Sequence, residues 1–226
     1  MLIEFAGISG SGKTTVFQKL TKGLRKSGAD VVRFHKAAKA EDLTQKEADQ
    51  AFRRRYPGLA KAIKQMGDGP SYELKNAARA RHVWMSGITE LDKLGPSAIG
   101  AVDEGYLHRC AYIAATGKGY NAFIDILDQL PLPDILVLVH VPLEEARRRF
   151  VHRMPTPDRR DVAAQRFDRR YTDHRLVRDF FEDALKVYRK KGVAIHRIDN
   201  SGDVDGAIGD LVNDIMQLHS KIKVAA

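Results

Sequence analysis

Short apolar runs alternate with amphipathic segments along this chain. Five runs predict buried strands, at residues 1–6, 31–35, 98–102, 134–141 and 193–198. The fourth run, DILVLVHV, is almost continuously apolar, which is typical of a strand in a parallel sheet that is covered on both faces. The pattern therefore predicts a fold built from strands that lie between layers of helices.

The segments between the strands carry apolar residues at helical spacing. In the last segment they form one continuous face, made by Val204, Ile208, Leu211, Val212, Ile215 and Leu218. Strands that alternate with helices predict a parallel, doubly wound sheet. We expect helices at 14–26, at 41–67 with a break at 56–58, and at 73–94, 107–116, 121–129, 143–154, 162–190 and 204–218.

The first predicted strand leads into a glycine-rich turn. Residues 7–14, GISGSGKT, match the pattern G-x-x-x-x-G-K-[ST] at every fixed position. Glycines let successive N–H groups point at phosphate oxygens, and the N-terminus of the following helix favours anions. We expect Lys13 to reach the β- and γ-phosphates of ATP and Thr14 to bind Mg²⁺. The phosphate cradle is predicted to comprise Ser9, Gly10, Ser11, Gly12, Lys13, Thr14 and Thr15.

This motif makes the fold prediction more specific. We expect a three-layer α/β P-loop NTPase fold whose five-stranded parallel sheet has the order 2-3-1-4-5. A single domain would span residues 1–226, with a helical lid at about 147–170.

A pair of carboxylates follows the third predicted strand. Asp103 and Glu104 are expected at the carboxyl edge of the sheet, where ligands bind in open α/β folds. Asp103 could hold Mg²⁺ through water or accept a proton from an attacking hydroxyl, and Glu104 could accept the proton instead. An ordinary turn, ended by Gly105, is the structural alternative. The nearby P-loop favours a functional role.

Arginines are concentrated between residues 147 and 178. Arginine binds phosphate through two parallel donors, and a closing lid can stabilise the charge of phosphoryl transfer. Most of these side chains are expected to lie in solvent, and Arg149 and Arg153 are the predicted ligand contacts. The cluster comprises Arg147, Arg148, Arg149, Arg153, Arg159, Arg160, Arg166, Arg169, Arg170, Arg175 and Arg178.

Composition indicates the partners and the cellular compartment of the protein, but it does not identify the reaction. The net charge of +9 favours anionic partners such as nucleotides, phosphorylated substrates or nucleic acid. A single cysteine, Cys110, rules out an internal disulfide and fits a reducing cytoplasm. The chain has no apolar run long enough to span a bilayer and no signal-like start, so a cytoplasmic, membrane-free protein is expected.

Several segments together resemble the thymidylate kinase group of nucleoside and nucleotide kinases. The P-loop stands at the N-terminus, and Ala77-Ala78-Arg79 is similar to the family's A-A-R segment. Asp103 matches the aspartate that the family carries after strand three, and residues 133–146 resemble its fourth strand and lid entrance. Residues 198–202, IDNSG, are similar to its last loop.

The resemblance implies a kinase that uses ATP and Mg²⁺. It implies that Arg79 contacts the phosphate of an acceptor nucleotide, and that Ser201 and Gly202 lie against the adenine of ATP. Two segments depart from the family: Glu104 replaces an arginine, and residues 33–38, RFHKAA, replace its R-E-P-G-G-T stretch. The resemblance therefore supports a kinase but does not identify thymidylate as its acceptor.

The expected reaction is transfer of the γ-phosphoryl group of MgATP to a nucleotide, a nucleoside or a similar small acceptor. A phosphate acceptor needs no strong base, whereas a hydroxyl acceptor calls for a nearby carboxylate such as that of Glu104. Two alternatives stay open: a kinase for a sugar or nucleic-acid hydroxyl, and a P-loop ATPase or switch with a protein partner. Nucleic acid is not favoured as a partner, and homodimerisation is left open.

Overall fold

The computed structural model describes residues 1–34, 97–103, 132–171 and 174–225, together with single positions at 50, 54, 57, 105, 107, 108, 111, 120, 124 and 127. Its centre is a five-stranded parallel sheet in the order β2-β3-β1-β4-β5. The parallel sheet and its predicted order 2-3-1-4-5 are confirmed. The strands are β1 (Leu2–Ala6), β2 (Asp30–Phe34), β3 (Ala98–Asp103), β4 (Ile135–His140) and β5 (Ala194–Asp199).

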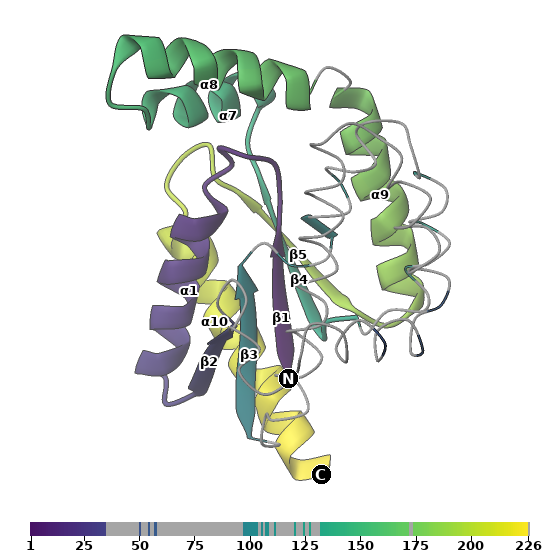
Figure 1. Cartoon of the computed structure of the whole chain (residues 1–226). Coiled ribbons are helices and arrows are strands. Elements are labelled where there is room, and N and C mark those ends of the chain that lie inside the picture. Colours follow the sequence, from purple (N-terminus) through teal and green to yellow (C-terminus); the bar gives the residue numbers. More distant parts are fainter. Residues whose placement is uncertain are drawn as a thin grey trace.

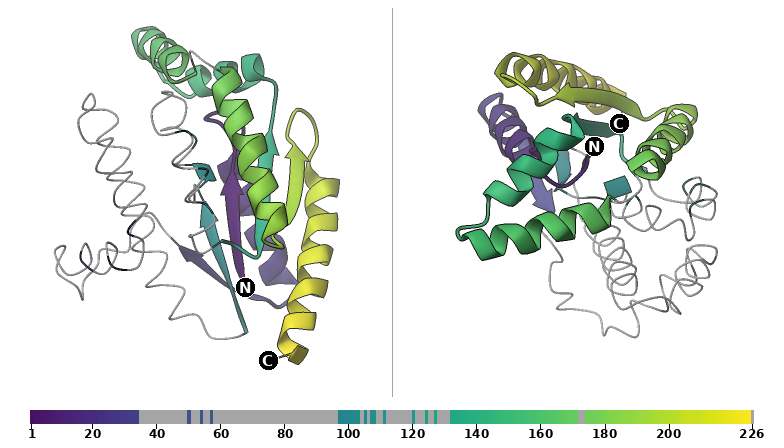
Figure 2. Two further views of the ribbon diagram at one scale, coloured as in Figure 1. Left: turned by 90° about the vertical axis from the view of Figure 1, so that its right-hand side faces the viewer. Right: turned by 90° about the horizontal axis from the view of Figure 1, so that it is seen from above.

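Helices cover both faces of this sheet (Figures 1 and 2). On one face lie α1 (Lys13–Lys26) and α10 (Asp205–Ala225), and α1 packs on β1 through an edge-to-face contact of Phe17 with Phe5 at 5.0 Å. On the other face α9 (His174–Lys190) contributes Phe180 and Leu185 to a second apolar cluster. Each face thus has its own core, which explains why the residues of β1 and nearly all of β4 are buried on both sides.

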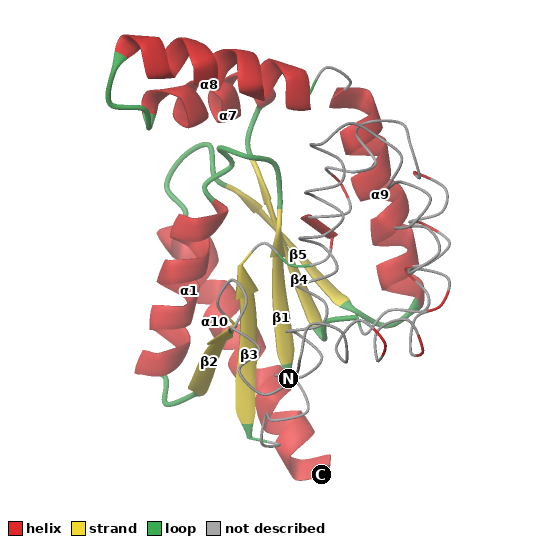
Figure 3. Ribbon diagram, in the orientation of Figure 1, coloured by secondary structure: helices red, strands yellow, loops and turns green. Residues whose placement is uncertain are grey.

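A helical hairpin covers the carboxyl ends of the strands. It consists of α7 (Leu143–His152) and α8 (Pro157–Arg170), and Figure 3 shows both helices beyond the ends of β1 and β4. The chain termini lie at the opposite end of the sheet (Figure 1). Among the described residues, no helix has both the length and the apolarity that a membrane span requires.

The predicted single helix at 162–190 is wrong. The structure has two helices there, α8 and α9, because the backbone at Tyr171 leaves the helical conformation with φ −121° and ψ 28°. The tyrosine ring turns inward and is buried, at 2% exposure. A polar pair of helix-capping type, Thr172-Asp173, follows it in the sequence and is the signal that could have revealed the break.

The five predicted strands and the helices predicted at 14–26 and 143–154 agree with the structure to within a few residues, and α10 continues to Ala225, past the apolar face predicted at 204–218. The pair Pro155 and Pro157 does interrupt the arginine-rich stretch, and Pro157 occupies the first turn of α8, where its missing N–H costs no hydrogen bond. The helices expected at 41–67, 73–94, 107–116 and 121–129 lie outside the described residues, except for helical positions 50, 54, 57, 107, 108, 111, 124 and 127.

A buried carboxyl group lies within β1. Glu4 is 2% exposed, its Oε1 accepts the backbone N–H of Leu107 at 2.7 Å, and its Oε2 accepts the Tyr188 hydroxyl at 3.4 Å. Burial disfavours the carboxylate and raises the pKa of Glu4 from 4.5 to about 7, although both hydrogen bonds act in the opposite direction. Glu4 therefore binds a proton in the folded chain at pH values where the unfolded chain has released it.

We expect Glu4→Gln to remove a pH dependence of stability. Between pH 4.5 and 7 the folded wild type binds more protons than the unfolded chain, so its free energy of unfolding falls as the pH rises. Urea titrations should show a loss of about 2 to 3 kcal/mol between about pH 5 and pH 8 that is absent from Glu4→Gln. The exposed variant Asp210→Asn is the control. Equal pH dependence in wild type and Glu4→Gln would contradict this role of burial.

Candidate phosphate-binding site

The P-loop is packed tightly between the hairpin and the loop after β5. Gly10 and Gly12 have φ values of +84° and +85°, in the region that favours glycine. A Cβ at Gly10 would lie 2.0 Å from the carbonyl oxygen of Ala146 in α7. A Cβ at Gly12 would lie 2.0 Å from Nδ2 of Asn200. The glycines predicted to free the N–H groups for phosphate are therefore also required by packing.

Lys13 lies at the mouth of this loop. Its side chain is largely buried, and Nζ donates a hydrogen bond to the carbonyl of Ile8 at 3.1 Å. The Ser11 N–H donates to the same carbonyl at 3.2 Å, and helix α1 begins when the N–H of Val16 donates to the carbonyl of Gly12. The loop thus closes on itself, and the Lys13 ammonium is bonded to its backbone.

A cavity of about 210 Å³ opens beside the P-loop. One wall is the loop itself, and the opposite wall comes from the α7–α8 hairpin. Its lining residues are Ser9, Gly10, Gly12, Lys13, Thr14, Phe150, Arg153 and Arg166. Three cationic side chains therefore line a cavity that also exposes the start of a helix, which is an arrangement suited to a polyphosphate.

The arginines of the hairpin divide into two groups. Arg147 forms two hydrogen bonds to Asp168 at 2.8 and 2.9 Å, so it joins α7 to α8. Arg148 and Arg149 both bind Glu145, at 2.7 and 2.5 Å, and these bonds lower the pKa of that carboxyl to about 2. All three arginines are thus paired within the hairpin, with Arg148 and Arg149 sharing one carboxylate.

The second group lines the cavity. Arg153 and Arg166 are exposed, and among the residues that the structure describes neither forms an ion pair. Arg153 was one of the two arginines predicted to contact ligand. Arg149, the other, approaches Gly12, with Nη1 3.7 Å from a Cβ placed there, but its Nε is bound to Glu145. Arg166 was not singled out, because its position depends on how α8 folds back over the loop.

Asp103 and Thr14 lie on the same side of the sheet. Asp103 is aligned with Phe5 on β1, and Phe5 packs against α1, so the aspartate points toward the face that α1 covers. Thr14 is in the first turn of α1 and lines the cavity. Oxygen ligands from a carboxylate and a hydroxyl suit Mg²⁺.

Two interactions connect the segment after Asp103 to β1 and the P-loop. The Leu107 N–H donates to Glu4, and Nδ1 of the buried His108 lies 2.8 Å from the carbonyl oxygen of Gly7. No pattern in the sequence predicts these interactions, since the partners are about a hundred residues apart. They fix the chain just after the predicted acidic pair.

Asn200 contacts the P-loop and was not among the residues predicted from the sequence. It is 8% exposed, its Nδ2 donates to the Ser11 carbonyl at 2.8 Å, and its N–H donates to the His140 carbonyl at 2.9 Å. Its neighbours Ser201 and Gly202, predicted to meet adenine, are exposed and adjoin the P-loop through Asn200. The only signal in the sequence was the resemblance of residues 198–202 to a family loop.

The remaining candidate residues do not line the cavity or lie outside the described residues. Ser11 is buried, and within the described residues its Oγ has no hydrogen-bond partner. Thr15 is exposed on α1, and it is not part of the cavity lining. Glu104 and Arg79 lie outside the described residues.

Comparison with known proteins relates the chain to a family of kinases. No family model matches the chain. A thymidylate kinase of Desulfotalea psychrophila is 30% identical over 154 residues, which make up 66% of this chain and 67% of that enzyme.

Solved structures share the fold at low sequence identity. Thymidylate kinase from Candida albicans superposes with a TM-score of 0.53 at 17% identity, covering 98% of this chain and 92% of that one. Deoxyadenosine kinase from M. mycoides with bound dATP gives 0.52 at 14% identity, covering 95% and 98%. Thymidylate kinase from Ehrlichia chaffeensis gives 0.51 at 18%, covering 96% and 98%.

We expect Asn200→Asp to weaken nucleotide binding at least tenfold. The carboxylate cannot donate to the Ser11 carbonyl, and it places a negative charge beside the phosphate cradle. Calorimetric titration with ADP measures the affinity. Asn213→Asp, an exposed change of the same kind on α10, should bind ADP like the wild type. If Asn200→Asp also binds like the wild type, Asn200 does not support the P-loop.

Proposed function

The chain belongs to the thymidylate kinase family, and on that basis we propose that it transfers the γ-phosphoryl group of MgATP to a nucleoside monophosphate. It is a P-loop phosphotransferase of the thymidylate-kinase type. The observation that carries the proposal is the cavity at the P-loop, where Lys13, Arg153 and Arg166 face the backbone turn of Gly10 and Gly12.

The described residues fit both MgATP components. A cradle whose glycines leave no space for a Cβ, together with three cationic side chains, matches the charge and the close approach of a triphosphate. Thr14 and Asp103, on the α1 side of the sheet, would hold Mg²⁺, with Asp103 acting through water. When bound, MgATP supplies the transferable phosphoryl group, and its metal neutralises phosphate charge.

The roles of the protein residues follow from their positions. Lys13 binds the β- and γ-phosphates from the loop side, and Arg153 and Arg166 bind phosphate oxygens from the hairpin side. Cations on opposite walls would stabilise the charge of the transferred phosphoryl group. Such electrostatic stabilisation is the main contribution of a protein to phosphoryl transfer. Phe150 occupies the hairpin wall and helps to exclude water from the same cavity.

The acceptor would lie beyond the γ-phosphate. Arg79 is proposed to bind the acceptor phosphate, as the family resemblance implies, and Glu104 to orient the acceptor or the metal-bound water. Transfer to a phosphate oxygen needs no strong base. A nucleoside hydroxyl is the second candidate, because Glu104 stands where the family carries an arginine and could serve as the base that a hydroxyl requires.

An acceptor screen tests the proposal. Purified protein with MgATP is assayed for ADP release in the presence of nucleoside monophosphates, nucleosides, sugars and oligonucleotides in parallel. Stimulation by monophosphates supports the proposal, and stimulation by nucleosides alone supports the second candidate. Hydrolysis that no small acceptor accelerates would favour an ATPase or switch and would refute both.

We expect Lys13→Ala to abolish phosphoryl transfer while the chain stays folded. The ammonium serves phosphate charge, and its hydrogen bond to the Ile8 carbonyl contributes about 1 kcal/mol. Turnover with the best acceptor, together with thermal unfolding, measures both effects. Lys22→Ala, an exposed lysine of the same helix, is the matched control and should keep full turnover. Wild-type turnover in Lys13→Ala would refute the assigned role.

A further inference from the structure

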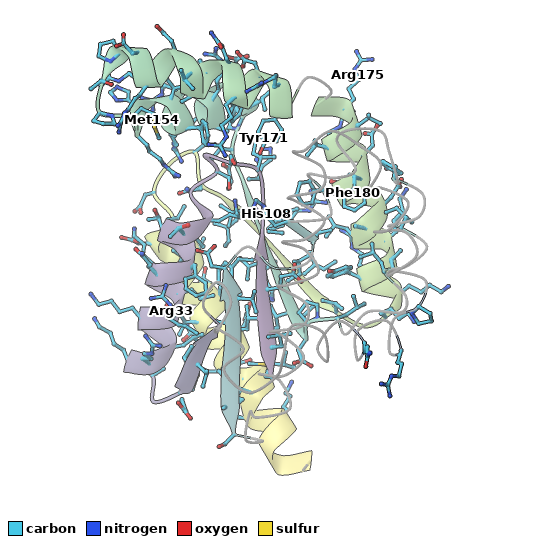
Figure 4. All side chains as sticks on the ribbon, viewed as in Figure 1. Arg33, His108, Met154, Tyr171, Arg175 and Phe180 are labelled. Atoms are coloured by element: carbon cyan, nitrogen blue, oxygen red, sulfur yellow. The ribbon has the colours of Figure 1, made fainter. Side chains whose placement is uncertain are left out.

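A tyrosine of the hairpin is bonded to the backbone of the P-loop. Tyr171 follows the last residue of α8, and its hydroxyl accepts the N–H of Ser9 at 2.7 Å. Figure 4 shows Tyr171 at the junction between α8 and the P-loop. Only 2% of Tyr171 is exposed, so its end of the bond is buried. The contact joins positions 162 residues apart in the sequence.

A column of aromatic rings holds this hydroxyl in place. The Tyr171 ring lies 4.5 Å from that of Phe167, which lies 5.6 Å from that of Phe150. Phe150 lines the cavity, and Ile8 of the P-loop packs against the same apolar cluster. Moving the hydroxyl therefore requires the contact between α7 and α8 to repack.

The bond acts on a peptide unit that also contacts Lys13. The N–H of Ser9 and the carbonyl of Ile8 belong to one planar peptide group, so fixing one end fixes the direction of the other. That carbonyl accepts the hydrogen bond from Nζ of Lys13 at 3.1 Å. The hydroxyl, the peptide and the ammonium thus form a chain of hydrogen bonds in which each bond polarises the next.

We propose that Tyr171 is a positioning residue for Lys13, acting through the Ile8–Ser9 peptide group. The inference rests on the proposed role of Lys13 in binding nucleotide phosphates. Because Tyr171 belongs to the hairpin, the orientation of the P-loop lysine depends on how the hairpin docks on the sheet. Docking of the hairpin on the sheet is thereby coupled to the orientation of Lys13 in the phosphate site.

The test is a double-mutant cycle read by nucleotide affinity. Tyr171→Phe keeps the ring and the aromatic column and removes only the hydroxyl. Calorimetry with ADP and with a non-hydrolysable ATP analogue should show an affinity about three- to tenfold below that of the wild type, the size expected for one hydrogen bond. In the Lys13→Ala background the same change should have no further effect, because its route through the lysine is gone.

The outcomes separate this inference from the proposed function. If Lys13→Ala binds nucleotide like the wild type, the proposed role of Lys13 fails. If Lys13→Ala loses affinity but Tyr171→Phe costs the same in both backgrounds, or costs nothing, the positioning role fails. Tyr120→Phe is the matched control. The Tyr120 hydroxyl donates to Asp183 at 2.8 Å, and neither residue lines the cavity, so this variant should leave nucleotide affinity unchanged.

Discussion

The site depends on the packing that holds the P-loop backbone open. Its N–H groups can face a phosphate only if neighbouring elements fix the loop from outside. The Ala146 carbonyl packs against Gly10, Asn200 packs against Gly12 and binds the Ser11 carbonyl, and Tyr171 binds the N–H of Ser9. These contacts come from α7, the loop after β5 and the end of α8. The central position of β1 in the sheet is what brings all three to the loop.

Some arginines of the hairpin form ion pairs within it, and others line the cavity. Arg147 binds Asp168 and so fastens α7 to α8, whereas Arg148 and Arg149 bind Glu145 within α7. Arg153 and Arg166 contribute the positive charge that the hairpin directs at the P-loop. A net charge of +9 is therefore a poor guide to the binding surface, because pairing decides which cations a ligand meets.

The sequence determined the sheet and the phosphate cradle, because both depend on local patterns. Runs such as 134–141 are apolar on both faces only in a covered parallel sheet, and GISGSGKT combines glycines, lysine and threonine at fixed spacing. It also marked Arg153, which does line the cavity. The error at 162–190 arose because helical periodicity continues across Tyr171, while a tertiary hydrogen bond to Ser9 draws that residue inward.

Only the tertiary structure decided which residues support the cradle and which arginines face it. Asn200, Tyr171 and His108 act on the P-loop from positions 101 to 189 residues away along the chain, through hydrogen bonds that leave no periodic signal. Arg166 faces the cavity because α8 folds back over the loop after the turn at 153–156. Local spacing specifies backbone conformation, whereas contacts between distant side chains appear only once the chain has closed on itself.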